Sequence, residues 1–297
     1  MFQRRMWLAL AGGIGCSGES TDGSTRVEQR WVVQGDVDIL VFTDTSDSMA
    51  DQLAALAGNV EILVSRLEAV ESNWHLIAVT GPDGCGQGGV LTRDTPDWPA
   101  LFAEGIVTKP GEDLVDEWGL YNAQEALVSS ATGGCNAGFL RREAHLSILF
   151  ISDEDDNSPG FDGGDPNYWQ TYVDGYQATK AEPERVHLSA VGGPEPEGCN
   201  SADFARGYWE AVSATNGQFL SICGNWEYEI EALADSAVVQ TSFPLAEPST
   251  GEGIRVFVDG LERLDGWSWL EANNEVTFTA RAPFAGQEVE IDYPSAY

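Results

Sequence analysis

Four oxygen-bearing side chains stand just after two predicted strands. Asp44, Ser46 and Ser48 form an Asp-x-Ser-x-Ser motif after one apolar run, and Asp153 follows a second apolar run later in the chain. Ligands of open α/β sheets bind beyond the carboxyl ends of the strands. We therefore expect these four side chains to share one crevice if the two strands are neighbours.

A site of this kind would offer a metal ion oxygen ligands only, which hard divalent cations prefer. The sequence therefore predicts Mg²⁺, or else Mn²⁺ or Ca²⁺, as a cofactor. The hydroxyls of Ser46 and Ser48 carry no charge, so the ion would remain electrophilic and could accept a carboxylate from a protein partner. The alternative is that the serines cap the following helix and that Asp44 satisfies backbone N–H groups.

A second acidic feature follows in the same region of the chain. The run 153–156 (Asp-Glu-Asp-Asp) is succeeded by Asp162 and Asp165. A flexible loop of carboxylates could hold a second ion, with Ca²⁺ as the natural choice. We favour the simpler interpretation of a solvated acidic loop, and we exempt Asp153 because it stands at a strand end.

The sequence does not contain the usual signatures of a hydrolase. It lacks the GxSxG and HExxH motifs, and its three histidines (His75, His145 and His187) fall within or at the start of predicted strands. No nucleophile–base pair is apparent at the predicted metal site. We therefore expect a non-catalytic interaction or adhesion module, with a structural envelope protein or a metal-assisted hydrolase as alternatives.

Residues 35–243 alternate apolar strand-like runs with amphipathic helical stretches. Strands are expected at 37–42, 74–80, 90–92, 146–151, 186–191 and 219–222, and helices at 53–67, 114–130, 168–180, 202–214 and 228–238. This alternation predicts an α/β domain with a doubly wound, mostly parallel sheet and helices on both faces. Residues 244–297 instead show short alternating strands with turn residues between them, which predicts a small antiparallel β domain.

The N-terminus has the arrangement of an export signal. Basic residues precede about nine apolar ones, far fewer than the ~20 that span a bilayer as a helix. The small residues before Cys16 resemble a bacterial lipoprotein signal over residues 1–16. This resemblance implies that Cys16 is acylated and anchors the chain to the outer membrane, on its periplasmic or cell-surface face; ordinary secretory cleavage is the alternative. Residues 17–34 are expected to form a flexible tether.

The four remaining cysteines are Cys85, Cys135, Cys199 and Cys223. An even number of thiols in an exported chain predicts two disulfides, for which three pairings are possible. We favour Cys85–Cys135 with Cys199–Cys223, because each pair would brace loops that flank neighbouring strands. Unpaired buried thiols are the alternative.

The charge of the chain excludes several classes of partner. Among 297 residues there are 48 acidic and 15 basic side chains, which gives a formal net charge of −33. Binding to nucleic acid phosphates or to anionic lipid headgroups requires a basic surface. We therefore expect no nucleic acid partner, and membrane association through a lipid anchor only.

The segment VDILVFTDTSDSM resembles the opening of a von Willebrand factor type A (VWA) domain with its metal-ion-dependent adhesion site. The likeness implies that Ser46 and Ser48 coordinate the metal directly, and that Asp44 and Asp153 act directly or through water. The family usually has a Thr or Ser where this chain has Leu114; Thr108, Asp113 or Asp116 could substitute. Two longer sequence segments, around Asp44 and Asp153, also resemble exported lipoproteins of deltaproteobacterial lineages such as myxobacteria.

Overall fold

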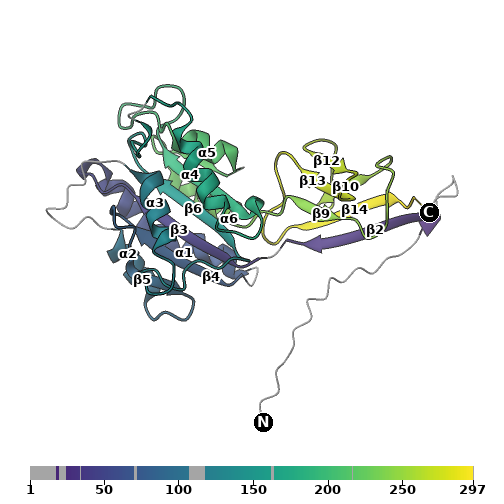
Figure 1. Ribbon diagram of the computed structural model, residues 1–297, viewed down its shortest axis with the longest axis horizontal. Helices are drawn as coiled ribbons and strands as arrows, with labels where there is room; N and C mark the ends of the chain where they lie inside the picture. Colours follow the sequence, from purple (N-terminus) through teal and green to yellow (C-terminus); the bar gives the residue numbers. More distant parts are fainter. Residues whose placement is uncertain are drawn as a thin grey trace, which may run out of the picture. The chain divides into compact units, whose positions relative to one another are not determined.

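The computed structural model describes residues 18–19, 25–33, 35–69, 72–106, 118–161, 164–215 and 217–296. The chain divides into two compact units (Figure 1). The α/β unit is Gln34–Val239, and the β unit combines the described residues that precede Gln34 with Gln240–Tyr297. The predicted division was 35–243 and 244–297, and it assigned no N-terminal strand to the second domain. Cys16 and the rest of the predicted signal lie outside the described residues.

The α/β unit is built on one six-stranded sheet in the order β5-β4-β3-β6-β7-β8. Its strands are β3 (Val37–Thr43), β4 (Trp74–Val79), β5 (Gln87–Thr92), β6 (His145–Ile151), β7 (Val186–Gly192) and β8 (Phe219–Ser221). All neighbouring strands are parallel except β5, which runs antiparallel to β4 at the edge. This confirms the prediction of an α/β unit with a mostly parallel sheet.

The central strands β3, β6 and β7 are buried along their whole length. Their near-continuous apolar sequences are typical of parallel strands that are covered on both faces. β3 and β6 pair in register up to their last residues, with Phe42 opposite Phe150 and Thr43 opposite Ile151. The segments that follow these two strands therefore start side by side.

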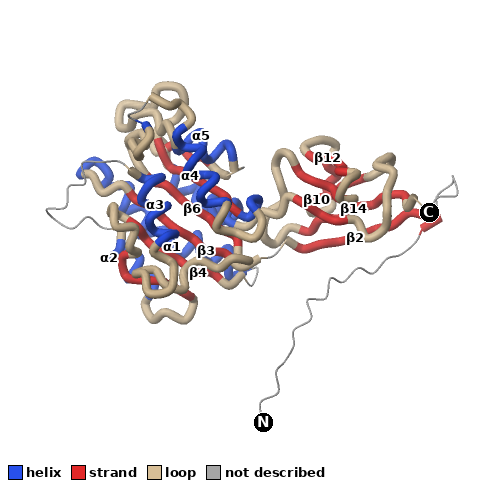
Figure 2. The backbone as a smooth tube through the Cα atoms, in the orientation of Figure 1, coloured by secondary structure: helices blue, strands red, loops and turns tan. Residues whose placement is uncertain are grey.

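Six α-helices accompany this sheet among the described residues. They are α1 (Ala50–Ala69), α2 (Trp98–Gly105), α3 (Gly119–Val128), α4 (Tyr168–Gln177), α5 (Tyr208–Ala214) and α6 (Ile230–Ala237). α3, α4 and α5 share a core with alternate strand residues such as Leu40 and Phe42. α1 packs against α2 and α6, and α6 also contacts β6 and β7. Helices and strands are distinguished by colour in Figure 2.

Short 3₁₀ turns complete the α/β unit. They are η1 (Asp47–Met49), η3 (Pro183–Arg185) and η4 (Trp226–Glu229). η1 matters for the site because it stands between the end of β3 and the start of α1. None of the helices in the described ranges combines the length and apolar character that crossing a bilayer requires.

The β unit contains two antiparallel sheets, ordered β1-β2-β14-β10-β11 and β12-β13-β9. Its strands are β1 (Gly18–Glu19), β2 (Thr25–Val32), β9 (Ser242–Pro244), β10 (Arg255–Val258), β11 (Leu261–Arg263), β12 (Trp267–Leu270), β13 (Glu275–Phe278) and β14 (Glu288–Pro294). The antiparallel β character predicted for the C-terminal region is therefore present, with two additional strands from the N-terminal region.

The prediction of a flexible tether over residues 17–34 was wrong for Thr25–Val32. These residues form β2 and pair with β14 over seven positions, from Val32 opposite Glu288 to Arg26 opposite Pro294. The segment TRVEQRWV alternates charged and less polar side chains, the period-two pattern of a strand with two different faces. Arg30 forms an ion pair with Glu290 at 2.9 Å, and Trp31 packs edge-on against Phe243.

Candidate functional site

Asp44 is the first residue after β3, and it is nearly buried. Its backbone N–H donates to the Ile151 carbonyl at 2.9 Å, which keeps β3 and β6 together at their carboxyl ends. Both of its carboxylate oxygens accept hydrogen bonds: Oδ1 from the Ser46 N–H at 2.8 Å and Oδ2 from the Ser152 hydroxyl at 3.1 Å. Asp44 therefore satisfies a backbone amide, as the helix-capping alternative expected, while also contacting the strand-end loop of β6.

The hydroxyls of Ser46 and Ser48 lie together in the turn that leads into α1. Their Oγ atoms are 3.0 Å apart. Ser46 occupies the N-cap position of η1, but its side chain makes no capping hydrogen bond there. The alternative interpretation, in which the serine hydroxyls only cap the helix, is therefore wrong for Ser46.

Asp153 reaches the same place from the end of β6. It is 8% exposed, and its Oδ1 atom is buried without a hydrogen-bond partner in the described structure. Burial raises the pKa of the Asp153 carboxyl. The charge of Asp44 and a side-chain hydrogen bond with Asp44 raise this pKa further, whereas a hydrogen bond with the Ser48 side chain opposes the shift. The structure therefore brings together Asp44, Ser48 and Asp153 from two separate strand ends.

Ser152 is a site residue that the sequence analysis missed. Its hydroxyl donates to Asp44 Oδ2 and also accepts the Glu154 N–H at 3.0 Å, so it fixes both the Asp44 side chain and the turn after β6. The only available signal was its position directly before Asp153 at a strand end. Leu114 and the three residues considered as substitutes for it lie outside the described residues.

The acidic run after β6 is not the uniformly solvated loop that we expected. Asp156 is fully buried, where its carboxylate accepts the Leu120 N–H at 2.9 Å and the Ser158 hydroxyl at 2.8 Å. Burial raises the pKa of Asp156 to about 6, although these hydrogen bonds act in the opposite direction. At the N-terminus of α3, protein donors take the place of water around the Asp156 carboxylate. Asp156 therefore has a structural role.

The other acidic residues of this region have separate partners. Asp155 forms an ion pair with Arg206, whose guanidinium lies over the Phe161 ring at 4.3 Å. Asp165 accepts the Asn167 N–H at 2.8 Å, and Asp162 lies outside the described residues. Within the described ranges, no group of three or more His, Cys, Asp and Glu side chains is arranged to hold a metal ion. Among the described residues, the site at Asp44 and Asp153 has two carboxylates together with the hydroxyls of Ser46, Ser48 and Ser152.

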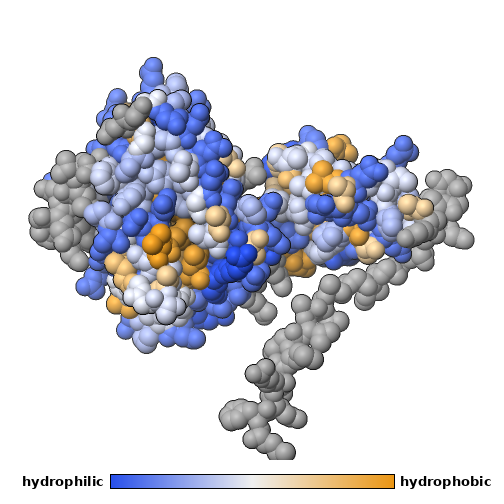
Figure 3. All heavy atoms as spheres, viewed as in Figure 1, coloured by the Kyte–Doolittle hydropathy of each residue, from blue (hydrophilic) through white to orange (hydrophobic). Residues whose placement is uncertain are grey.

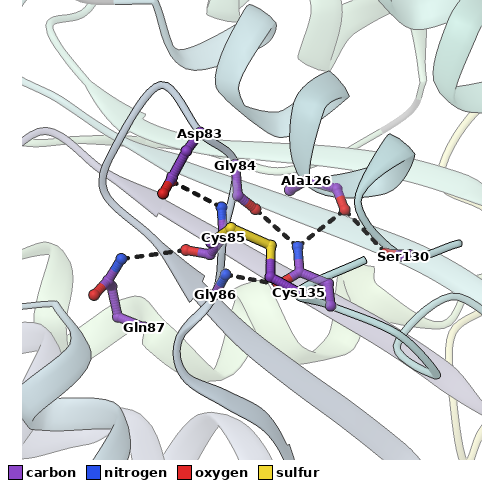
Figure 4. The surroundings of a disulfide bond; sticks show 9 residues. Asp83, Gly84, Cys85, Gly86, Gln87, Ala126, Ser130 and Cys135 are labelled. Atoms are coloured by element: carbon purple, nitrogen blue, oxygen red, sulfur yellow. Dashed lines mark hydrogen bonds between the residues drawn. A yellow bond between two sulfur atoms is a disulfide. The ribbon is translucent and has the colours of Figure 1, made fainter. Parts of the chain in front are cut away.

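The favoured disulfide pairing is confirmed. Cys85 is bonded to Cys135, and Cys199 to Cys223. Figure 4 shows the first of these. Asn136, next to Cys135, donates to the carbonyls of Gly84 and Ala126 at 2.7 and 3.0 Å. Disulfides persist in oxidising compartments, so both bonds are consistent with the predicted export of the chain.

The histidines lie at the opposite ends of the strands from the predicted site. His145 and His187 begin or nearly begin β6 and β7, and their rings stack with centroids 5.8 Å apart. Burial lowers the pKa of both rings, that of His145 to about 3. The Nδ1 atom of His75 lies 2.9 Å from the Phe139 carbonyl oxygen. The three histidine rings therefore contribute to the packing and hydrogen bonding of the sheet.

Comparisons with known proteins do not assign the chain to a family. No family model matches the chain, and no curated protein matches it. The pilus adhesin SpaC of Lactobacillus rhamnosus GG, in its open conformation, is 12% identical with a TM-score of 0.41, over 94% of this chain and 42% of the adhesin. Proximal thread matrix protein 1 of the mussel byssus is 15% identical with a TM-score of 0.44, over 73% of this chain and 51% of that protein. The chain thus spans about half the length of these proteins, or less.

Proposed function

We propose that this chain is a non-catalytic, divalent-metal-dependent interaction or adhesion module. In this proposal the α/β unit is a doubly wound domain of the VWA type. Its metal site comprises Asp44, Ser46, Ser48 and Asp153, and a lipid on Cys16 anchors the chain in the cell envelope. The partner is a protein that presents an acidic side chain to the metal.

The observation that carries the proposal is the unpartnered carboxylate oxygen of Asp153. A buried polar atom without a hydrogen bond is costly, and more so when a second carboxylate lies close to it. Asp153 Oδ1 is such an atom, and the charge of Asp44 acts on the Asp153 carboxyl group. A cation at this position would satisfy the oxygen and offset the repulsion between the two carboxylates.

The hydroxyl pair supports the same ion. Two oxygens in adjacent positions of an octahedral Mg²⁺, each at about 2.1 Å, are about 3.0 Å apart. The Oγ atoms of Ser46 and Ser48, which are hydrogen-bonded to each other, already have this separation. The two hydroxyls and Asp153 would therefore hold the ion directly. Asp44 would act through water, because both of its oxygens already accept hydrogen bonds.

The topology of the sheet favours a ligand site at this place. From β3 the chain proceeds to β4 and β5 on one side, and β6, β7 and β8 follow on the other side. β3 and β6 thus flank the point at which the strand order reverses, where ligands of doubly wound sheets bind. Asp44 follows the first of these strands and Asp153 the second.

The composition of the site suggests what a bound ion would do. It would supply an electrophile for a carboxylate of the partner, because two of its protein ligands would be neutral hydroxyls. The formal charge of −33 disfavours an anionic partner in the absence of such an ion. Attraction of an acidic side chain should consequently depend on the metal.

The proposal is tested by calorimetric titration of Mg²⁺, Mn²⁺ and Ca²⁺ into the mature protein. We expect saturable binding that is lost in the Ser46→Ala/Ser48→Ala double variant and in Asp153→Asn. Asp165→Asn is the matched control, since it removes one carboxylate from an exposed turn and should bind like wild type. Equal heats from wild type and the double variant would exclude the metal site.

A second titration tests the class of partner. A short neutral peptide with a single Asp should bind in the presence of Mg²⁺ and not in EDTA, and its Asn counterpart should bind in neither. If the protein binds metal but does not distinguish the two peptides, the metal site stands. The proposed capture of acidic side chains is then contradicted. Unaltered envelope association of Asp44→Ala cells, without any metal binding, would favour the structural alternative.

A further inference from the structure

The Cys199–Cys223 disulfide lies in a loop that touches the backbone of Asp153. This loop, residues 193–207, connects the end of β7 at Gly192 to the start of α5 at Tyr208. Cys223 belongs to the segment that follows β8. The disulfide therefore joins two segments that follow neighbouring strands on the β6–β8 side of the sheet.

The 193–207 loop folds closely upon itself. The Cys199 N–H donates to the Ala202 carbonyl at 2.8 Å, and the Ala205 N–H donates to the Gly193 carbonyl at 3.1 Å. A Cβ atom at Gly193 would lie 1.7 Å from the Asp203 carbonyl oxygen, so only glycine permits this approach. The loop thus returns to the end of β7 with Asp203 in a fixed position.

Two backbone hydrogen bonds join this loop to the acidic run after β6. The Asp203 N–H donates to the Asp153 carbonyl at 2.8 Å, and the Asp156 N–H donates to the Arg206 carbonyl at 2.9 Å. The segment 153–156 is consequently held at both of its ends by the 193–207 loop. The orientation of the Asp153 side chain toward Asp44 and Ser48 depends on this backbone.

We infer that Cys199 and Cys223 are positioning residues for the metal site: their disulfide holds the 193–207 loop so that Asp203 fixes the backbone of Asp153. The inference rests on the proposed function in that Asp153 is taken as a metal ligand. Cys199 is four residues from Asp203, and the Ile222 N–H, next to Cys223, donates to the Gly192 carbonyl at 3.0 Å. The disulfide thus links the outer part of the loop to a segment already attached to the sheet.

The other disulfide provides a matched comparison. Cys85–Cys135 connects the segment after β4 to the segment after α3, among Gly84, Gly86 and Ala126 (Figure 4). Its loss should lower stability, as the loss of any cross-link does. We do not expect it to move Asp153.

The test compares the Cys199→Ser/Cys223→Ser and Cys85→Ser/Cys135→Ser double variants of the mature protein. Each is titrated with Mg²⁺ and Mn²⁺ at a temperature well below its own unfolding midpoint. Loss of one backbone hydrogen bond at Asp153 should weaken metal binding about fivefold in the first variant. The second variant should bind within about twofold of wild type. Equal affinities in the two folded variants would overturn the inference.

A second readout does not depend on the metal. Amide hydrogen exchange at Asp203 and Asp156 should accelerate in Cys199→Ser/Cys223→Ser and remain as in wild type in Cys85→Ser/Cys135→Ser. If wild type binds no metal, the proposed function fails, and this measurement still decides whether the disulfide positions the loop. Unchanged protection at Asp203 would contradict the inference directly.

A further variant serves if the Cys199→Ser/Cys223→Ser protein does not fold. Asp203→Pro keeps the disulfide and removes the N–H that donates to Asp153. It should reproduce the loss of metal affinity with the disulfide intact. Wild-type metal affinity in a folded Asp203→Pro protein would show that the contact has no positioning role.

Discussion

The carboxylate of Asp156 accepts the backbone N–H of Leu120 at 2.9 Å, in the first turn of α3. This bond joins the acidic run after β6 to a helix 36 residues earlier in the chain. It explains why an apparently solvated acidic residue is fully buried. The loop that contains Asp153 is therefore fixed by the α3 N-terminus on one side and by the 193–207 loop on the other.

The first prediction concerns this bond. Asp156→Ala should lower the free energy of unfolding by about 2 kcal/mol, because it removes a helix-capping acceptor and leaves buried donors unpaired. Chemical denaturation at pH 7 measures the effect. Asp155→Ala is the control from the same run, since its partially exposed ion pair with Arg206 should contribute about 1 kcal/mol or less. Equal effects of the two substitutions would contradict the assigned role of Asp156.

A second prediction concerns the buried ion pair between Lys180 and Asp38. Their side chains are fully buried with Nζ and Oδ2 2.7 Å apart, and Arg141 Nε also lies 2.7 Å from Asp38 Oδ1. Lys180→Met should destabilise the α/β unit by about 3 kcal/mol, because it removes one of the two cations that pair with the buried side chain of Asp38. Urea titration followed by tryptophan fluorescence measures the loss.

The matched control for Lys180 is an exposed pair. Arg255→Met breaks the contact with Glu262 on the surface of the β unit and should leave the unfolding midpoint near that of wild type. A double-mutant cycle with Asp38→Asn should show that the Lys180 and Asp38 effects are not additive. Additive effects would mean that the pair does not act as a unit.

A third prediction is a pH dependence that comes from His145. Burial lowers its pKa to about 3 from an ordinary value of 6.5, and His187, Arg185 and Lys180 act in the same direction. Between about pH 3 and pH 6.5, His145 therefore binds a proton in the unfolded chain but not in the folded chain. The stability contributed by the neutral ring is complete above pH 6.5 and is lost as the pH falls toward 3. The slope from this one group is at most about 1.4 kcal/mol per pH unit.

His145→Leu should reduce that slope. The measurement is the free energy of unfolding of wild type and variant at pH 7, 6, 5 and 4, taken as a difference so that other titrating groups cancel. Leu149→Val, in the same strand, controls for packing and should shift stability equally at every pH. Parallel curves for wild type and His145→Leu would contradict the prediction.

A fourth prediction concerns the thermal stability of Asp153→Asn, which should exceed that of wild type without metal and fall below it with saturating metal. Asp153→Asn removes one of two adjacent carboxylates, so in EDTA it should raise the thermal midpoint of the α/β unit by about 2–4 °C. Saturating Mg²⁺ should stabilise wild type and have no effect on Asp153→Asn, because ligand binding stabilises only a protein that binds it. Calorimetric melts with and without Mg²⁺ measure both effects. Identical metal shifts in the two proteins would remove Asp153 from the site.

The fifth prediction concerns β2. A chain that begins at residue 34 lacks β2 and leaves β14 without one neighbour, so its β unit should unfold at a lower temperature and aggregate. A chain that begins at residue 25 keeps the strand and should melt like the mature protein. Size-exclusion chromatography and thermal melts distinguish the two truncations. Equal behaviour would restore the flexible-tether interpretation of this segment.

Local sequence patterns predicted most of the α/β unit. Strands that are buried on both faces have continuous apolar runs, and α1 has apolar residues at helical spacing, so both signals are contained in a few neighbouring residues. α2 was missed because it is only eight residues long. Short elements carry too few periods of a pattern to be distinguished from loops.

The sequence was less informative about β2 and Asp156, for one physical reason. The alternation of Thr25–Val32 is weak by itself, and its meaning comes from β14, more than 250 residues later. Similarly, Asp156 is of a residue type usually found on the surface, and it is buried because α3 begins beside it. Partners that are distant in sequence leave no local signal in either segment.

The sequence by itself determined that oxygen-rich turns follow two buried strands, and that four cysteines are available for two cross-links. The tertiary structure decided that β3 and β6 are neighbours, that Ser152 fixes Asp44, and that one carboxylate oxygen of Asp153 is buried without a hydrogen-bond partner. The reason is that residue type and strand-end position are local properties of the chain. Convergence of side chains and competition for hydrogen bonds arise only when distant segments pack together.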